Sequence, residues 1–523
     1  EVFRLVLPWT DREQAASSVD RTRLAVLPFV DINKDPENEY FTDGMTEELI
    51  FRISRIEGLR VIAQTSVATY KGSDKSIAAI AEELRVGTVL EGSVRKHGSR
   101  LRITAQLIDA STQEHLWADR YDGEMDDIFA VQTRIAEQVA GQLEVVLTPA
   151  EHSAVARQST ANVEAYNLYL QGRHLVGRRV AAALQSALEK FRAAIELDPD
   201  FGAAHAGVAD ALSLMPQVGL MPFEEAHAQA EVAAKRAIEL DPATPTGYVS
   251  LAFVYLHLGN RATEVERLLA KALEINPDDA TAEYYKGLLA SDRLRMRDAA
   301  SSLLRAAELD PLTQAVAANA GLTLSLLGRF DEAERLLKAT MELGENWISL
   351  VYYAGYLVYA GRAAEAVAYA ERAAATQPGH PGPYDYLAAI YLALGEPQKA
   401  LAALDKLDGI LEQGDVLTMS GSVRLRERML RATALAWEDR REEAEAIRDE
   451  IAGRSDLGVV HGAIAYIETA LGNDQAAIDS LLAALEAKDQ LLTLLKVDPT
   501  FTRLHGQPRV EELMRAVQLD DDA

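Results

Sequence analysis

A short string that ends in Asp-Pro or Asn-Pro returns along the middle of the chain. It stands first at residues 188–200 (LEKFRAAIELDPD) and returns as AIELDP, ALEINP and AAELDP. Each copy is typical of the end of an amphipathic helix, because proline has no N–H to donate and disfavours a helical conformation in the residue before it. Pro242, Pro277 and Pro311 are 35 and 34 residues apart, and Pro378 follows after 67 more. A period near 34 residues with two helices per unit predicts a helical solenoid.

The residue types inside each period resemble the tetratricopeptide repeat. Small residues such as Gly287 and Gly321 stand where paired helices would cross, with leucines and aromatics between them and a proline at the close. The resemblance covers about two-thirds of the chain. It implies stacked helix pairs whose concave face comes mainly from the first helix of each pair. It does not imply one function, since such arrays bind unrelated partners.

Residues 21–148 have a different periodicity and predict an α/β domain. The apolar runs at 24–30 and 59–63 predict buried strands. Three alternating segments at 88–96, 100–109 and 113–121 predict an antiparallel meander. Helices are expected from the loop after residue 45 to about 56, and at 76–84 and 126–147, which gives the order βαβαβββα. Residues 39–45 are predicted to be a loop that opens the first helix, with Thr42 or Asp43 as its cap.

Four strings in this region resemble the TolB-like amino-terminal domain over residues 23–148. They are YFTDGMTEELI, VLEGSVRK, LRITAQLIDASTQEHLWADRYDG and DIFAVQTRIA, and DPTFTRLHGQPRVEELM at 498–514 resembles the closing segment of the associated repeat arrays. The resemblance implies the non-catalytic C-terminal region of a bacterial transmembrane regulator. In such proteins an upstream winged-helix, adenylate/guanylate cyclase or kinase module precedes a membrane span.

These patterns predict four parts. Residues 1–20 are a juxtamembrane or linker segment, and 21–148 are the TolB-like α/β domain. Residues 149–497 are a tetratricopeptide superhelix of about nine helix pairs, and 498–523 are a capping segment. The opening EVFRLVLPW is too short to span a bilayer, so it is read equally as the end of a span cut off upstream or as a free terminus. The resemblance favours the periplasmic side of the inner membrane, with the cytoplasm as the alternative.

Residue chemistry argues against catalysis within this chain. The sequence has no phosphate-binding glycine loop, no nucleophile elbow and no cysteine, and its ten histidines form no pair at helical metal spacing. We therefore expect no enzyme activity, no cofactor and no metal. The formal net charge of −27 argues against a nucleic-acid surface, which needs a concentrated positive field.

The repeat pattern places a set of mostly apolar or small residues on the concave face. These are Val249, Phe253, Tyr284, Leu288, Leu322, Val351, Gly355, Val358, Asp385 and Ala389. Such a groove suits a peptide, a partner helix or another copy of the protein. In the α/β domain, Asp43 and Met45 are candidate contact residues, although a helix cap is the favoured interpretation of that stretch. The apolar insertion at 213–222 is read as a local core contact rather than as a lid over the groove.

The predicted function is recognition. A protein, peptide or small ligand would bind in the repeat groove or at the junction between the α/β domain and the repeats, and an attached span would pass the change to an effector domain. The alternative is an envelope or cytoplasmic assembly scaffold without signalling output. Nucleic acid is not an expected partner, and membrane contact is expected only through an upstream span.

Overall fold

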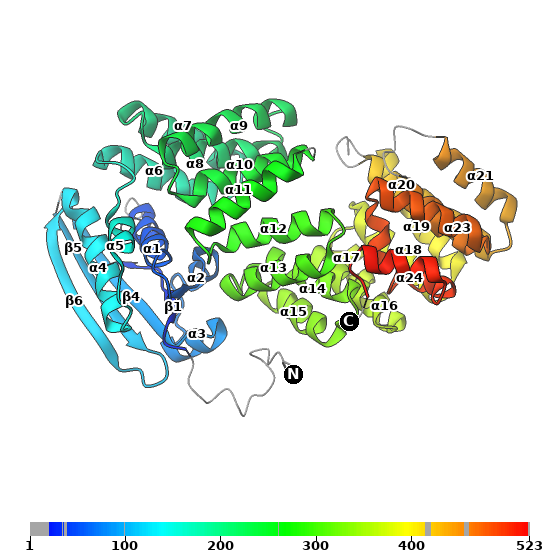
Figure 1. Cartoon of the computed structure of the whole chain (residues 1–523), viewed down its shortest axis with the longest axis horizontal. Coiled ribbons are helices and arrows are strands. Elements are labelled where there is room, and N and C mark those ends of the chain that lie inside the picture. The colour runs from blue at the N-terminus through cyan, green and yellow to red at the C-terminus, as the bar shows by residue number, and fades with distance from the viewer. Residues whose placement is uncertain are drawn as a thin grey trace. The chain divides into compact units, whose positions relative to one another are not determined.

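The fold is seen in a computed structural model that describes residues 20–33, 35, 39–98, 100–259, 261–413, 420–453 and 460–520 (Figure 1). The chain divides into two compact units, which are described separately below. Unit 1 is Glu1–Tyr285 with Glu308–Thr313, and unit 2 is Lys286–Ala307 with Gln314–Ala523. The predicted juxtamembrane segment lies outside the described residues, apart from Asp20. No helix in the described ranges is both long and apolar enough to cross a membrane.

Unit 1 begins with a mixed β-sheet in the order β3-β1-β4-β5-β6, with β2 paired to β4. The strands are β1 (Arg23–Val26), β2 (Val30–Asp31), β3 (Arg60–Val61), β4 (Thr88–His97), β5 (Arg100–Asp109) and β6 (His115–Glu124). β1 runs parallel to β3 and β4, whereas β4, β5 and β6 form the predicted antiparallel meander. The register pairs Leu24 with Thr88 and Val94 with Ile103.

Helices cover the sheet on two sides because side chains of a strand alternate between its faces. On β1, Leu24 and Val26 join the core under α1 (Glu39–Ile53) and α4 (Ile128–Gln142). Ala25 and Leu27 face the opposite core, formed with α2 (Gln64–Ala68) and α3 (Ile77–Leu84). The two-sided burial explains the continuous apolar run from residue 24 onward.

The α/β domain differs from its prediction at three places. The predicted loop at 39–45 is helical, because α1 already begins at Glu39. Thr42 is therefore not a cap, and its hydroxyl donates to the Glu39 carbonyl inside the helix. The short β2 and α2 were not predicted, and neither was α5 (Pro149–Ala156), which Thr148 caps before the repeats begin. Within this helix, the missing side chain of Gly44 allows close packing against Leu170.

The repeats form antiparallel helix pairs. In unit 1 they are α6 (Val163–Val176), α7 (Ala181–Leu197), α8 (Gly202–Leu214), α9 (Phe223–Leu240), α10 (Pro245–Leu258) and α11 (Ala262–Ile275). The helices α12 (Ala280–Asp292) and α13 (Met296–Leu309) have residues in both units. Residues 215–218 form a 3₁₀ turn, and Met215 is buried there, so the apolar insertion packs locally.

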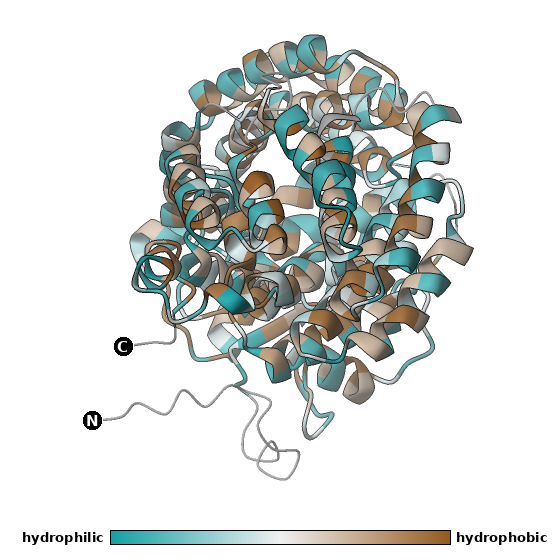
Figure 2. Ribbon diagram, turned by 90° about the vertical axis from the view of Figure 1, so that its right-hand side faces the viewer, coloured by the Kyte–Doolittle hydropathy of each residue, from teal (hydrophilic) through white to brown (hydrophobic). Residues whose placement is uncertain are grey.

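Unit 2 continues the same pattern. Its further helices are α14 (Gln314–Leu326), α15 (Phe330–Leu343), α16 (Trp347–Tyr359), α17 (Ala363–Thr376), α18 (Pro381–Ala393), α19 (Pro397–Gln413), α20 (Ser420–Trp437), α21 (Arg441–Ala452), α22 (His461–Leu471), α23 (Asp474–Ala487) and α24 (Pro508–Ala516). Between α23 and α24 lie the 3₁₀ segments η5 (Gln490–Leu494) and η6 (Pro499–Leu504). In Figure 2 many of the helices carry hydrophobic and hydrophilic residues on different faces, as a stacked solenoid requires.

The crossing points and helix ends behave as the sequence predicts. A Cβ added at Gly321 on α14 would lie 2.6 Å from a side-chain carbon of Leu337 on α15, so only glycine allows this crossing. α7 ends at Leu197, and Asp198 before Pro199 has an extended backbone. The predicted loss of repeat signal at 412–422 falls mostly on residues outside those described.

Candidate functional site

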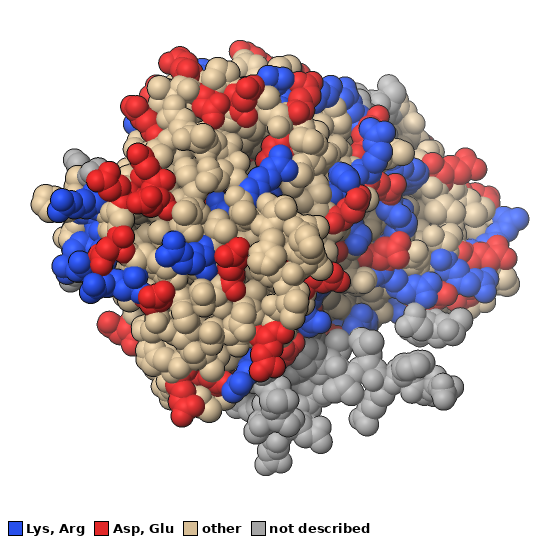
Figure 3. All heavy atoms as spheres, turned by 60° about the vertical axis from the view of Figure 1, so that its left-hand side comes forward, with Lys and Arg blue, Asp and Glu red and all other residues tan. Residues whose placement is uncertain are grey.

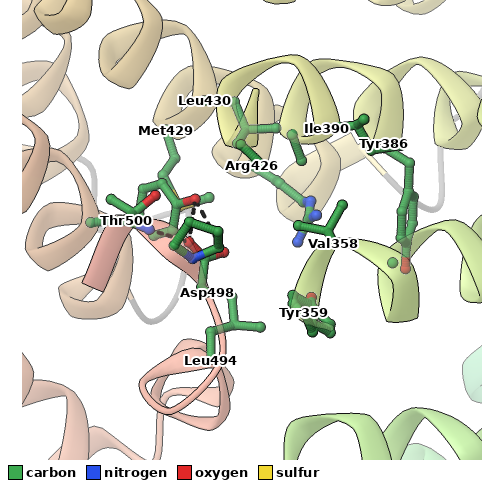
Figure 4. A pocket seen from close by; sticks show the side chains of 15 residues that line it. Val358, Tyr359, Tyr386, Ile390, Arg426, Met429, Leu430, Leu494, Asp498 and Thr500 are labelled. Carbon is green, nitrogen blue, oxygen red and sulfur yellow. Dashed lines mark hydrogen bonds between the residues drawn. The ribbon is translucent and has the colours of Figure 1, made fainter. Parts of the chain in front are cut away.

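The first helices of successive pairs in unit 2 share a pocket with the C-terminal segment (Figure 4). Tyr359 on α16, Tyr386 on α18, Arg426 on α20 and Tyr466 on α22 supply its polar lining, and Asp498 before η6 completes it. Apolar side chains fill the space between them: Val358, Ile390, Met429, Leu430 and Leu494. The cavity volume is about 30 Å³. That is room for one or two water-sized groups, so the pocket fits one small group of a larger ligand.

Arg426 is held in place from beneath by Asp385. Its Nε donates to Oδ2 of Asp385 at 2.6 Å, and Asp385 is only 7% exposed. Burial raises the pKa of Asp385, whereas the negative charge of Asp385 raises the pKa of Arg426. The guanidinium lies 5.6 Å from the ring centroid of Tyr386. Within the described residues its two terminal amines have no hydrogen-bond partner, so they remain available to a ligand.

The opposite wall comes from Asp498. Its carboxylate accepts from the Tyr466 hydroxyl at 3.1 and 3.2 Å and from the backbone N–H of Thr500 at 2.9 Å. Burial raises the pKa of Asp498. Burial also raises the pKa of Tyr359, to about 12. Like any tyrosine at neutral pH, its hydroxyl is protonated and can donate a hydrogen bond.

The C-terminal wall is a permanent part of unit 2. Leu492, Leu495, Phe501 and Leu504 are fully buried, and Phe501 meets the Tyr466 ring edge-on with centroids 5.3 Å apart. Burying one such side chain contributes about 1.5–3 kcal/mol. Releasing the segment would expose all four together, so the pocket is preformed rather than opened by displacement of this wall.

Several predicted groove residues meet at this pocket. Gly355, Val358 and Ala389 line it, and Asp385 lies directly behind Arg426. Val351 is buried in a separate small core and is not accessible, which corrects its assignment to the groove surface.

The other predicted residues lie elsewhere. Leu288 and Leu322 are half-buried on α12 and α14 of unit 2, and Val249 is half-buried on α10 of unit 1. Also in unit 1, Phe253 stacks on Tyr285 with centroids 5.3 Å apart, and Tyr284 packs beside Tyr285. The repeat register therefore predicts which helix face each residue lies on, but it does not predict which of these faces together form a pocket.

Of the two candidates in the α/β domain, Asp43 contacts the first repeat of unit 1. Oδ2 of Asp43 lies 2.9 Å from Nδ1 of His174 on α6, and Lys71 donates to Oδ1 at 2.6 Å. Met45 is 1% exposed in the domain core beside Gln132, so its assignment as a contact residue is corrected. The stretch that contains both residues is part of a packed helix and not of a contact loop.

Sequence reasoning did not single out Arg426, Tyr386, Tyr466 or Asp498. Arg426 follows the stretch where the repeat signal is lost, and Asp498 lies in the predicted cap. Tyr386 directly follows the predicted Asp385 on α18, the first helix of its pair. An aromatic residue beside a predicted groove residue was the one sequence feature that could have indicated Tyr386. Among the described residues no group of three or more histidine, aspartate or glutamate side chains is arranged to hold a metal ion.

Solved structures of other helical repeat proteins are similar to part of this chain at low sequence identity. A tetratricopeptide repeat protein from Parabacteroides merdae is 18% identical over 51% of this chain and 99% of its own, with a TM-score of 0.37. Yeast Tom70 is 15% identical over 75% of this chain and 95% of its own, with a TM-score of 0.38. The chain has a small N-terminal sheet region followed by a tetratricopeptide-type solenoid. These likenesses concern the fold alone.

Two further matches concern the N-terminal part and a relative. Residues 20–138 match the family described as HilA/YgeH-like transcriptional regulator, second domain. A protein of Rhizobium meliloti described as "Putative adenylate cyclase 3" is 38% identical over 233 residues, which are 44% of this chain and 39% of that protein. This chain thus spans about two-fifths of the length of that relative. The TolB-like resemblance stays a prediction.

Proposed function

We propose that this chain is the non-catalytic interaction region of a bacterial signalling protein. In this proposal a peptide segment of a partner protein lies along the first helices of unit 2 and places one small polar group in the Arg426 pocket. The observation that carries it is the preformed pocket, in which the Arg426 guanidinium is anchored by Asp385 and still has free amines. Because this site is already ordered, binding of one small group there costs little free energy for rearrangement.

In this proposal, binding changes the activity of an effector domain elsewhere in the full-length protein. The relative described as an adenylate cyclase and the match to a domain of transcriptional regulators support such an arrangement. Binding would bias the placement of the interaction region and thereby the effector. We further propose that the region lies on the periplasmic side of the inner membrane, as the TolB-like resemblance implies.

The surface of the chain is compatible with a protein partner. Figure 3 shows acidic and basic side chains interspersed over the visible face rather than separated into one large patch of either sign. Specificity would then come from the shape and polar groups of the pocket and less from long-range charge.

The test is site-specific photocrosslinking of the full-length protein in its own cells. A photoreactive residue at Ala389, which lines the pocket, is expected to capture a defined partner, and Val358→Arg should abolish capture by filling the pocket. The same residue at Lys406, exposed on the second helix α19, is the control position. Equal capture from both positions, or capture that survives Val358→Arg, would refute the proposal.

Effector output separates signalling from scaffolding. In the same full-length protein, Val358→Arg should change the activity of the effector domain. If the partner is lost but effector output stays the same, the region is an assembly scaffold.

A further inference from the structure

A second cavity lies within unit 1, where the α/β domain meets the first repeats. Its volume is about 80 Å³. One face of α1 supplies Gly44, Glu47, Glu48 and Phe51, and Arg55 follows in the turn after α1. The remaining walls come from the segment after α5 and from α6, α8 and the start of α10. Domain junctions are common places for small-ligand sites.

The carboxylates that line this cavity each have their own arginine. The N–O distances are 2.7 Å for Glu47 with Arg173, 2.8 Å for Glu48 with Arg52 and 2.6 Å for Asp241 with Arg157. Asp210, outside the lining, shares Arg173 at 3.2 Å and accepts from Ser250. The ion pairs of the acids near the cavity are therefore formed with arginines other than Arg55.

Arg55 is the exception among these charges. Its Nη1 donates to the Ala154 carbonyl at 2.9 Å and its Nη2 to the Thr244 hydroxyl at 3.2 Å, while the guanidinium lies 4.1 Å from the Phe51 ring centroid. Nε is buried and has no acceptor. Within the described part of the chain, no carboxylate lies at ion-pair distance from it. Burial lowers the pKa of Arg55 to about 10, although the charges of Glu48 and Asp241 act in the opposite direction.

A buried cation is costly unless an anion compensates it. We propose that the cavity binds a small monocarboxylate beside Arg55. The cavity volume holds several water-sized groups, which matches a carboxylate with a short carbon chain. The hydroxyl-bearing residues Ser159 and Thr246 also line the cavity. The Thr244 hydroxyl lines it as well, but its proton is already donated to Asp241 at 2.6 Å. The ligand is expected to carry one negative charge, because Arg157 and Arg173, the other arginines of the lining, already pair with Asp241 and Glu47.

This site is independent of the proposed partner groove, which lies in unit 2. Because its walls come from α1 and from the repeats α6, α8 and α10, a bound carboxylate would tighten the packing between the α/β domain and the first repeats. The site therefore gives unit 1 a way to respond to a small anionic solute.

The experiment titrates the whole chain with sodium acetate and sodium propionate at constant ionic strength, by calorimetry and thermal unfolding. We expect saturable binding and a rise in Tm. Arg55→Gln should weaken binding by about tenfold or more, because it removes a charge-assisted partner. Ala203→Leu should abolish binding by filling the cavity without changing its charge. Arg60→Gln, at an exposed arginine of the same domain, is the control and should bind like the wild type.

The wild type alone can overturn the inference. The inference fails if neither acid shows saturable binding up to about 100 mM, because a dissociation constant above that concentration is too weak for a specific site. It also fails if Ala203→Leu binds as the wild type does, whatever the folding of Arg55→Gln. Loss of binding in both variants, with the control unchanged, supports it.

Discussion

Gly44 on α1 packs directly against Leu170 on α6. A Cβ built at residue 44 would lie 2.5 Å from a terminal methyl carbon of Leu170, which is only 4% exposed, so the Leu170 side chain would have to shift. Around this contact, Asp43 meets His174 and Glu47 meets Arg173. The stretch YFTDGM thus joins the α/β domain to the first repeat helix within unit 1.

Gly44→Ala should destabilise unit 1 by about 1–3 kcal/mol, because it overpacks a buried helix crossing. The matched control is Gly141→Ala on α4, where an added Cβ meets nothing within 4 Å. That change should stabilise by about 0.5–1 kcal/mol, since alanine favours a helix over glycine. Urea unfolding measures both. Equal stabilisation by both variants would contradict the packing argument.

Asp310→Ala should destabilise unit 1 by about 1–3 kcal/mol, because it leaves the buried hydroxyl of Ser66 without an acceptor. The Ser66 hydroxyl donates to Oδ1 of Asp310 at 2.5 Å and the Thr65 hydroxyl to Oδ2 at 2.6 Å. Asp200→Ala is the control, since that side chain is 83% exposed. Denaturant unfolding that gives the same midpoint for both variants would show that the Asp310 cluster is not stabilising.

Arg426→Leu should destabilise unit 2 by about 3–5 kcal/mol, because Asp385 would keep a buried charge without its partner. Replacing both residues by leucine should restore much of the loss, since no uncompensated charge remains. Arg440→Leu, which removes an exposed partner of Glu443, is expected to leave the unfolding midpoint unchanged. A double variant less stable than Arg426→Leu would refute this account.

Two glutamates should give the chain a stability that falls in acid. Burial raises the pKa of Glu231, but hydrogen bonds from Lys235, Arg261 and Tyr255 outweigh it and bring that pKa to about 2. Glu334 has the same arrangement in unit 2, and its pKa is also about 2. Because the pKa of Glu231 in the folded protein lies below the ordinary glutamate value of 4.5, the stabilisation is present above pH 4.5 and is lost as the pH falls towards 2.

The measurement is the free energy of unfolding at pH 6 and pH 3. Glu231→Gln should reduce the loss between these pH values by about 1–2 kcal/mol relative to the wild type. Glu239→Gln, on the same helix but exposed, should keep the wild-type pH dependence. If both variants follow the wild type, Glu231 does not carry the effect.

Local spacing was sufficient to predict most of the fold. The proline period, the crossing glycines and the alternating segments of the meander depend on neighbours within a few residues, so they can be read without the tertiary structure. The predicted start of α1 was wrong, because Thr42 and Asp43 are residue types that favour helix caps, whereas both lie inside a helix that begins at Glu39. The candidate site was harder, because Gly355 and Val358 follow the repeat register whereas Arg426 and Asp498 do not.

The Asp-Pro motif separates what the sequence determined from what the tertiary structure decided. Its proline ends the helix wherever it occurs, because the missing N–H and the clash with the preceding residue are local. The partners of its aspartate differ: Asp198 accepts from Thr160, whereas Asp310 accepts from Ser66, 244 residues away in the chain. Arg426 likewise finds Asp385 only after α18 and α20 are stacked. Helix ends were therefore set by the sequence itself, while the partners of buried polar groups, and with them both candidate sites, were decided by long-range packing.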